Sequence, residues 1–372
     1  MKNWLKYSML TILAITALSA CKDDDETPDY IPNPFSSSKI IDTAGVDHPY
    51  YNGSIQNPTV ANMEEMKDRG VVSIRGSLVF SDFDYSNEDI KTLNFLDSIT
   101  GNLSFIADST LTEIGGFENL LYIGGNLLIE RNFLAKEING FPNLGWIEGN
   151  ITIKNNEVMS SLAGLSTLET FKGNLRIGVM PDLLSLEGLN KIDSVLELSI
   201  EGLGVQNLKG LESLEYVESN VMISSNPFLK SFEGLERINT LTRLDIAQNE
   251  SLVSLDGLEN LEVVTGEFRL LANDALNDLT NLKNLNTVGG LNISSNNSLS
   301  NLDGLEQVNI ALPNRQGALQ IDTNASLAVS GMCGIKHLAE ESVANDSFIW
   351  NVSLANGDRI APEQVADLTC PL

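Results

Sequence analysis

Few side chains in this chain could carry out chemistry together. Its 372 residues include two histidines, His48 and His337, and three cysteines. The sequence contains no Ser-His-Asp, Cys-His or His-x-x-x-His pattern and no glycine-rich phosphate loop, so nucleophilic, metal-assisted and phosphate chemistry lack their usual motifs. We interpret both histidines as structural or surface residues, and we predict neither catalytic activity nor a cofactor.

The first cysteine, Cys21, follows a segment that is typical of protein export. Two lysines precede an apolar stretch, residues 9–18, which is too short to span a bilayer. The sequence Leu18-Ser19-Ala20-Cys21 resembles the lipobox of bacterial lipoproteins. This resemblance implies a signal peptide over residues 1–20 and a lipid on Cys21. An ordinary signal peptide followed by a chance cysteine is the alternative.

The residues after Cys21 indicate a tether. Lys22-Asp23-Asp24-Asp25-Glu26 resembles the acidic signal that sends some lipoproteins to the outer face of the outer membrane. Residues 21–38 also contain three prolines and no periodic apolar pattern. We therefore expect a lipid-anchored outer-membrane protein, facing the cell exterior, with residues 21–38 as a flexible tether. A purely solvated linker and a weak cation site are the alternative roles of the acids.

The two remaining cysteines, Cys333 and Cys370, lie near the end of the chain. Two thiols in an oxidising compartment most often pair, so we predict a disulfide between them. In the chain-entropy model, closing a loop of this length stabilises the fold by ~3–4 kcal/mol.

The charge of the chain is strongly acidic. Fifty acidic residues outnumber 23 basic ones, and the formal net charge is −27. A negative field of this size opposes polyphosphate partners, so nucleic acid is not an expected ligand. A soluble, well-hydrated surface is the simplest interpretation.

One sequence pattern recurs about eleven times between residues 71 and 327. Each repeat begins with a short strand in which polar and apolar residues alternate. An Asn, two short segments with regularly spaced leucines and a Gly-Leu bend follow. Successive strands are 23–25 residues apart, except for a last interval of 28. This period predicts a mainly β fold, a right-handed parallel β-solenoid or leucine-rich-repeat-like stack of about eleven coils. The residues aligned by this period are Phe80, Phe105, Ile129, Ile153, Ile177, Ile200, Ile223, Ile246, Leu270, Ile293 and Ile321.

The segments on either side of the repeats differ from them. Residues 39–70 are irregular and contain one short helical pattern, and residues 328–372 combine helical and strand-like patterns. Because a solenoid exposes its core at both ends, we predict an N-terminal cap over 39–70 and a C-terminal cap over 328–372.

An asparagine recurs three residues after seven of the eleven strand positions. An amide at one fixed register is typical of an internal ladder that bonds backbone groups at a bend. We predict such a ladder, rather than a ligand site, for Asn132, Asn156, Asn226, Asn249, Asn273, Asn296 and Asn324.

The repeat resembles the receptor L-domain, the leucine-rich, β-helix-like module of the insulin and epidermal growth factor receptors. The match is best at Gly76-Ser77-Leu78-Val79-Phe80 and Gly101-Asn102-Leu103-Ser104-Phe105. The resemblance implies extracellular display and recognition of macromolecules. This chain has many more coils than those receptors and lacks their cysteine-rich modules, so growth-factor binding is not implied.

Two rows of side chains are candidates for an interaction surface. The residue before the last apolar residue of each coil is expected to point outward, which places Tyr122 beside Trp146. Exposed aromatic and basic groups can stack on sugars or anchor a protein, and a rigidifying aromatic ladder is the alternative. The row comprises Tyr122, Trp146, Thr170, Lys191, Tyr216, Arg237, Val263, Thr287 and Gln307, of which we favour Tyr122, Trp146, Tyr216 and Arg237 as binding residues.

The second row consists of carboxylates around the glycine bends. Glu233 and Asp256 precede a glycine, and Glu236 and Glu259 follow one. A solvated edge, partly compensated by lysines, is the simplest interpretation, and weak Ca²⁺ binding is the alternative. No metal site is predicted beyond this weak candidate.

These observations favour a non-catalytic recognition or adhesion module for another macromolecule, carried on a surface lipoprotein. Many β-helical enzymes place their active sites in long loops between coils, and the even spacing here leaves no room for such loops. The alternatives are a glycan-binding accessory protein of a polysaccharide-uptake system and a structural envelope protein.

Overall fold

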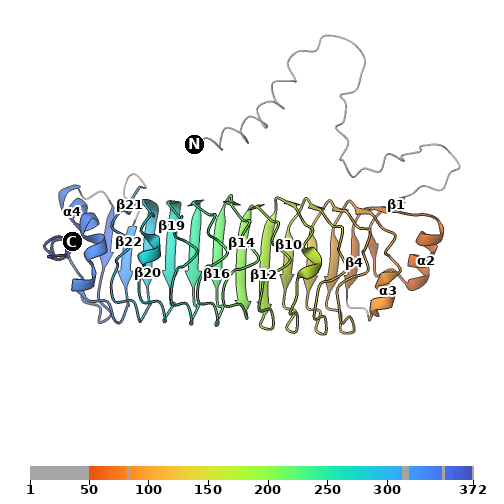
Figure 1. Ribbon diagram of the computed structural model, residues 1–372, viewed down its shortest axis with the longest axis horizontal. Helices are drawn as coiled ribbons and strands as arrows, with labels where there is room; N and C mark the ends of the chain where they lie inside the picture. The colour runs from red at the N-terminus through yellow and green to blue at the C-terminus, as the bar shows by residue number, and fades with distance from the viewer. Residues whose placement is uncertain (1–49, 82–83, 312–317, 346–347, 371–372) are drawn as a thin grey trace, which may run out of the picture. The chain divides into compact units, whose positions relative to one another are not determined.

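The computed structural model describes residues 50–81, 84–311, 318–345 and 348–370. Contacts divide the chain into Met1–Ser38 and Lys39–Leu372, and all described residues belong to the second unit. This unit is a β-solenoid of about eleven turns, as the period predicts (Figure 1). The expected signal peptide, Cys21, the tether and His48 lie outside the described residues.

One long parallel sheet runs through the whole solenoid. Its register pairs Phe80 with Phe105 and Ile293 with Ile321, which confirms the alignment made from the period. Every described pair of neighbouring strands in it is parallel, because each coil adds one strand in the same direction. Its main path is β2 (Ile55–Gln56), β4 (Leu78–Ser81), β6 (Leu103–Ile106), β8 (Leu127–Glu130), β10 (Ile151–Lys154), β12 (Asn174–Met180), β14 (Glu197–Leu203), β16 (Asn220–Ser224), β18 (Arg243–Ala247), β19 (Val263–Leu271), β20 (Thr287–Ser294), β22 (Ala318–Asp322) and β23 (Ile349–Val352).

A second set of short strands, each a few residues before a main strand in the chain, is discontinuous. The strand β17 (Thr240–Leu241) pairs with β19, and β21 (Asn309–Ile310) pairs with β20. The strands β13 (Ser194–Val195) and β15 (Tyr216–Val217) form a sheet of their own. The rest form a sheet of β1 (Tyr50–Asn52), β3 (Ser73–Arg75), β5 (Ser98–Ile99), β7 (Tyr122–Ile123), β9 (Trp146–Ile147) and β11 (Thr170–Phe171).

The core is a column of aliphatic side chains with aromatic stacks near its N-terminal end. In the main sheet, side chains alternate between buried and partly exposed, because successive residues of a strand point to opposite faces. The rings of Phe80 and Phe105 stack with centroids 5.0 Å apart, and Phe117 stacks on Phe141 at 5.6 Å. Each such buried side chain contributes roughly 1.5–3 kcal/mol by leaving water.

The predicted asparagine ladder is confirmed. All seven asparagines are buried, and five of them donate from the main-chain N–H to the Oδ1 of the next ladder asparagine, namely Asn132, Asn226, Asn249, Asn273 and Asn296. Asn249, for example, donates from Nδ2 to Ile223 O (3.0 Å) and to Asn273 Oδ1 (3.2 Å). Its own Oδ1 accepts from the main chain of Asn226 at 3.1 Å. The amides thus fix the bend and join neighbouring coils.

The residue before each ladder position has a left-handed backbone. These residues have φ between 52° and 64°, and Gly202 is the one glycine among those that the structure describes. Like Thr323 with φ 52°, Val179 has a left-handed backbone, with φ 53°, and a β-branched side chain, which this conformation disfavours. Asn155 holds the equivalent position in the preceding coil.

Replacing Val179 by asparagine should raise the free energy of unfolding by about 1 kcal/mol, because Asn tolerates a left-handed backbone better. The half-exposed valine side chain makes no core contribution that would offset this gain. Urea denaturation of Val179→Asn against the parent measures the change. A destabilised variant would show that the backbone at this position is not strained.

The glycine bends also prove to be hydrogen-bonded. Gly210, Gly234, Gly257 and Gly304 have φ between 102° and 112°, where a side chain is strained. The N–H of each donates to the carboxylate two residues later, as from Gly257 to Glu259 Oε2 at 2.9 Å. Part of the acidic row is therefore explained by the geometry of the bend.

Helices lie at both ends of the solenoid (Figure 1). The helix α2 (Val60–Asp68) begins with a capping box at Thr59 and buries Met63 and Met66. The helix α3 (Asn87–Lys91) follows it, and α4 (Lys336–Asn345) and α5 (Pro362–Ala366) lie at the C-terminal end. Single 3-10 turns form at η1 (Ala163–Leu165), η2 (Thr280–Leu282), η3 (Val329–Gly331) and η4 (Cys333–Ile335).

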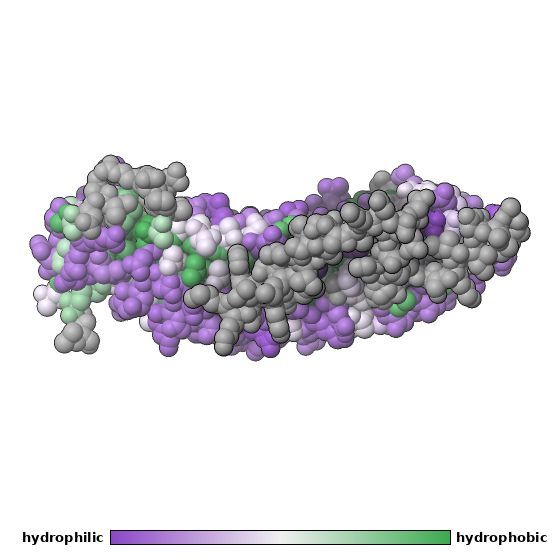
Figure 2. All heavy atoms as spheres, turned by 90° about the horizontal axis from the view of Figure 1, so that it is seen from above, coloured by the Kyte–Doolittle hydropathy of each residue, from purple (hydrophilic) through white to green (hydrophobic). Residues whose placement is uncertain are grey.

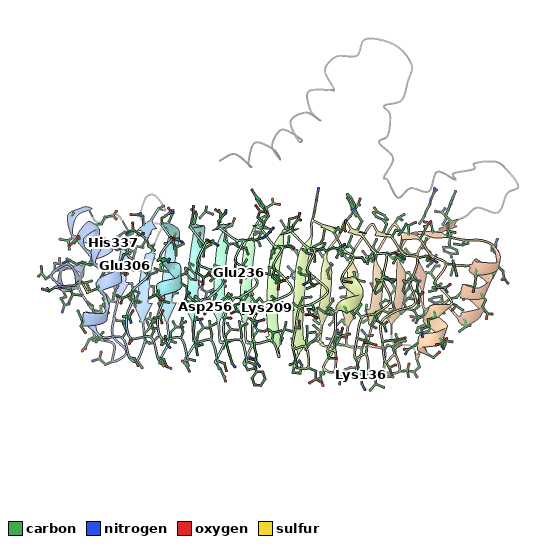
Figure 3. The ribbon with its side chains drawn as sticks, viewed as in Figure 1. Lys136, Lys209, Glu236, Asp256, Glu306 and His337 are labelled. Carbon is green, nitrogen blue, oxygen red and sulfur yellow. A yellow bond between two sulfur atoms is a disulfide. The ribbon has the colours of Figure 1, made fainter. Side chains whose placement is uncertain are left out.

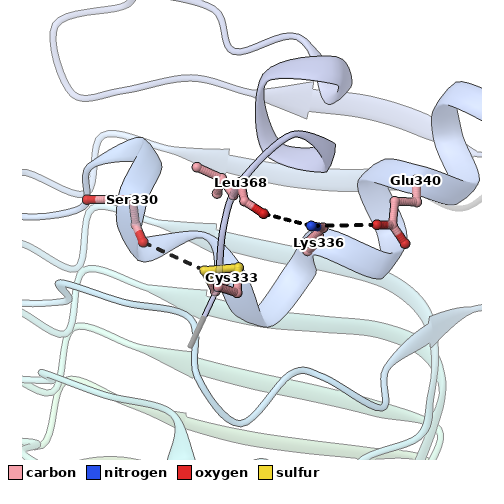
Figure 4. The surroundings of a disulfide bond; sticks show 6 residues. Ser330, Cys333, Lys336, Glu340 and Leu368 are labelled. Carbon is pink, nitrogen blue, oxygen red and sulfur yellow. Dashed lines mark hydrogen bonds and ion pairs between the residues drawn. A yellow bond between two sulfur atoms is a disulfide. The ribbon is translucent and has the colours of Figure 1, made fainter. Parts of the chain in front are cut away.

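The predicted disulfide joins Cys333 in η4 to Cys370 (Figure 4). Their Cα atoms are 5.7 Å apart. Lys336 Nζ donates to Leu368 O at 2.7 Å and lies 3.9 Å from Glu340 Oε1, so the same region is also held by polar contacts. The C-terminal segment is therefore fastened to the start of α4 at two neighbouring points.

Reduction of this disulfide should lower the free energy of unfolding by about 3–4 kcal/mol, because the unfolded chain regains the entropy of a loop of 37 residues. Urea denaturation with and without reductant measures the difference. The variant Cys333→Ser/Cys370→Ser should match the reduced protein and should not respond to reductant. Equal stability in both conditions would show that the polar contacts alone hold this segment.

Candidate interaction surface

The four favoured binding residues fall into two pairs. Tyr122 and Trp146 are directly opposite each other in β7 and β9, as the period predicts. Tyr216 lies in β15, beyond the coils that contain Thr170 and Ser194, and Arg237 lies in the coil after it. The two pairs are therefore in different parts of the solenoid and do not form one site.

The prediction that Tyr122 is exposed is wrong. Only 8% of it is accessible, whereas Trp146 is partly exposed. The Tyr122 hydroxyl lies over Gly124, where the Cβ of any larger residue would be 2.8 Å from it. Because Gly124 has no Cβ, it leaves room for this hydroxyl.

Three further residues assigned to the outward row do not belong to it. The register places Ser194, Thr240 and Asn309 in the row instead of Lys191, Arg237 and Gln307. Each coil has three apolar residues at nearly equal spacing, so the spacing alone does not show which of them is the last. The misassigned residues each precede a buried middle residue, namely Ile192, Ile238 and Val308.

Arg237 contributes instead to a shallow, open depression that spans three coils. Tyr216 adjoins it in the chain, because it follows Glu215, and 41% of its surface is accessible. The depression therefore combines carboxylates, amides and one guanidinium with a neighbouring exposed aromatic ring. Its lining residues are Glu215, Glu236, Arg237, Asn239, Asn260 and Glu262.

The carboxylates proposed for weak Ca²⁺ binding each have a partner in the protein. Glu236 and Glu259 accept from glycine N–H groups. Glu233 pairs with Lys209 at 2.8 Å, and this hydrogen bond raises the pKa of the lysine. Asp256 accepts from Asn281 Nδ2 at 2.7 Å. In the described ranges, no group of three His, Cys, Asp or Glu residues could hold a metal ion.

Side chains in this region lie along the outside of successive turns. Figure 3 labels Lys209, Glu236 and Asp256 in the C-terminal half of the solenoid and Lys136 at an edge of the N-terminal half. The face seen in Figure 2 is mainly hydrophilic where it can be seen, with hydrophobic patches towards the C-terminal end. His337, far along the chain, contacts Val308 O through Nε2 at 2.6 Å.

Sequence reasoning missed an ionic network on the outer face of β18 and β19. Asp245 lies between two arginines, 3.0 Å from Arg243 Nε and 3.4 Å from Arg269 Nε. Arg243 Nη2 also lies 3.6 Å from Glu267 Oε2. The alternation Arg-Leu-Asp-Ile beside Glu-Phe-Arg-Leu could have revealed it once the register was known. Partly exposed pairs of this kind contribute about 0–1 kcal/mol each.

No protein-family model matches this chain, and no curated protein matches it. Among the described residues, no helix is both long and apolar enough to cross a membrane. The likeness to receptor L-domains and to lipoproteins therefore rests on the motifs quoted above.

Proposed function

We propose that this protein is a surface-displayed outer-membrane lipoprotein whose solenoid is a non-catalytic recognition or adhesion module for another macromolecule. The main support is the continuous register of the long sheet from β2 to β23, which arranges outward residues in straight rows. An extended surface of this kind suits an extended partner that makes many small contacts. The L-domain-like motifs favour display outside the cell.

Within this surface, the depression beside Tyr216 supports the proposal best. It offers hydrogen-bond acceptors on Glu215 and Glu262, donors on Arg237, and an adjacent exposed ring. Rings and arginines that meet a partner together contribute most to binding. Trp146, partly exposed in β9, is the second candidate contact.

The same chemistry favours a glycan as the second candidate partner. Sugar rings stack on aromatic faces, and their hydroxyl groups bond to carboxylates and amides. The depression has carboxylates and amides within three neighbouring coils, and the exposed ring of Tyr216 follows Glu215 in the chain. Under this alternative, the protein presents polysaccharide to an uptake system.

Binding assays on matched tyrosine variants test the site. Tyr216 and Tyr51 are equally exposed, at 41%, but Tyr51 lies in β1, far from the depression in the sequence. Tyr216→Ala should weaken binding at least tenfold, and Tyr51→Ala should leave it unchanged. Equal losses from both variants, or from neither, would contradict a site at the depression.

The ligand class is decided with the same proteins. A glycan array that gives signals lost in Tyr216→Ala would favour the glycan alternative. Covalent cross-linking from a photoreactive group placed at position 216 to one defined protein, with no glycan signal, would favour adhesion to protein. If the parent protein binds neither class on intact cells, the recognition proposal fails.

The anchor is tested separately. Metabolic labelling with an alkyne fatty acid should label the parent protein and not Cys21→Ser, which should leave the membrane fraction. Protease treatment of whole cells should then degrade the anchored form. An unlabelled parent protein would overturn the lipoprotein assignment without affecting the binding site.

A further inference from the structure

The repeats change their construction near the middle of the solenoid. Before this point, an outer row of asparagines links the coils: Asn126 N donates to Asn102 Oδ1 at 2.8 Å, and Asn174 N to Asn150 Oδ1 at 2.8 Å. The next residue in the row is Glu197, which bonds to Arg176 instead. The outer ladder therefore ends at β12.

The inner ladder is interrupted at the same coils. It runs from Asp108 through Asn132 to Asn156, and it begins again where Leu203 N donates to Asn226 Oδ1 at 3.0 Å. Met180 and Leu203 occupy the two positions between, and both are completely buried. We call these two residues the ladder gap.

The ladder gap removes specific hydrogen bonds between coils. Asn156 Nδ2 donates to Ile129 O, and Asn226 Nδ2 donates to Ile200 O. By the same register, residues 180 and 203 would reach the carbonyl groups of Ile153 and Ile177, but their side chains have no amide. Met180 likewise offers no side-chain oxygen to the N–H of Asn156.

The second set of short strands also breaks in this region. The sheet that begins with β1 ends at β11, and β13 and β15 form a separate pair. Only the main sheet bridges the gap without interruption, through the pairing of β12 with β14 as far as Met180 and Leu203. A left-handed valine, Val179, lies directly beside the gap.

We propose that the ladder gap divides the solenoid into two blocks that unfold separately, residues 50–171 and residues 220–370. In a stack of repeats, cooperativity depends on the coupling between nearest neighbours. At the ladder gap, several of these side-chain bonds and one of the two strand ladders are missing, so the coupling there depends on the main sheet. One block can then open while the other remains folded.

Two tryptophans report on the two blocks. Trp146 lies in β9, and Trp350 lies in β23, where its Nε1 donates to Ile360 O. Both reporter proteins are full-length and carry Trp4→Phe. Adding Trp350→Phe leaves Trp146, which reports on the first block, and adding Trp146→Phe leaves Trp350, which reports on the second. Urea denaturation should give two fluorescence transitions with different midpoints.

Hydrogen exchange in the parent protein checks that each tryptophan represents its block. Protection of β8 and β10 should disappear together with the Trp146 signal, and protection of β16 and β18 with the Trp350 signal. Loss of protection in all four strands at one urea concentration, with coincident fluorescence transitions, would overturn the proposal. This measurement needs no change at the gap.

Filling the gap tests its cause. Met180→Asn/Leu203→Asn should restore a continuous ladder and bring the two midpoints together. The control Met180→Leu/Leu203→Met keeps both positions apolar and should leave the midpoints apart. Midpoints that stay apart in a folded Asn variant would show that the ladder gap is not the cause of separation.

Discussion

Replacing Asn249 by alanine should lower the free energy of unfolding by about 3–5 kcal/mol. The side chain is completely buried and makes four ladder hydrogen bonds, two accepted from Asn226 and two donated to Ile223 O and Asn273 Oδ1. Alanine leaves several buried polar groups without these partners, and each costs about 1–3 kcal/mol. Urea denaturation of Asn249→Ala measures the loss.

The matched control is an asparagine that bonds to a neighbouring coil at the surface. Asn119 Nδ2 donates to Asn94 O at 2.7 Å and is exposed, so water can replace the bond. Asn119→Ala should cost about 1 kcal/mol or less. If Asn249→Ala were as mild as Asn119→Ala, the internal ladder would not be a main source of stability.

Replacing Gly257 by alanine should also destabilise the protein by about 3–5 kcal/mol. Its φ of 102° is strained for any residue with a Cβ. The new Cβ would lie closer than 3.0 Å to the main-chain carbonyl of Phe232 in the preceding coil, so the backbone must move. Thermal and urea denaturation measure the effect.

Gly145 provides the control for this prediction. A Cβ there meets nothing within 4 Å, and its φ is not positive. Gly145→Ala should therefore be neutral or stabilise by up to about 1 kcal/mol, because alanine reduces the freedom of the unfolded chain. A tolerated Gly257→Ala would mean that neighbouring coils are less closely packed than the structure has them.

Much of the fold could be predicted because its period is simple. The spacing of Phe80, Phe105 and their equivalents gave the strand register, and the recurrent asparagines gave the inner ladder. Both follow from short-range patterns that most coils repeat. The interruption of the second sheet did not follow, because two-residue strands such as β13 carry almost no pattern of their own.

The candidate surface was predicted less well, for two physical reasons. Because the apolar residues of a coil are equally spaced, the sequence does not show which is the last of the coil. The prediction for Arg237 was therefore wrong, whereas Tyr216 lies in the predicted row. The alternation of residues along a strand also predicts on which face a side chain lies, but it does not predict how the side chain is tilted. The burial of Tyr122 over Gly124 could therefore not be foreseen.

The acidic row illustrates a signal that was present but not used. Glutamate recurs two residues after the bend glycine, at Glu212, Glu236, Glu259 and Glu306, and Asn190 takes the same place after Gly188. An acceptor at this fixed distance is typical of a local side chain to backbone bond. The carboxylates there stabilise bends first, and only what remains exposed can contribute to binding.

Distances between spin labels on the outer face of the main sheet test whether outward residues form straight rows with one strand spacing per coil. Register places Thr152 seven coils and Ser199 five coils from Gln320. In a Cys21→Ser background, labels on Thr152→Cys/Gln320→Cys should be about 34 Å apart, and on Ser199→Cys/Gln320→Cys about 24 Å. Two distances that do not differ by roughly two strand spacings would contradict the stacked rows and the interaction surface built on them.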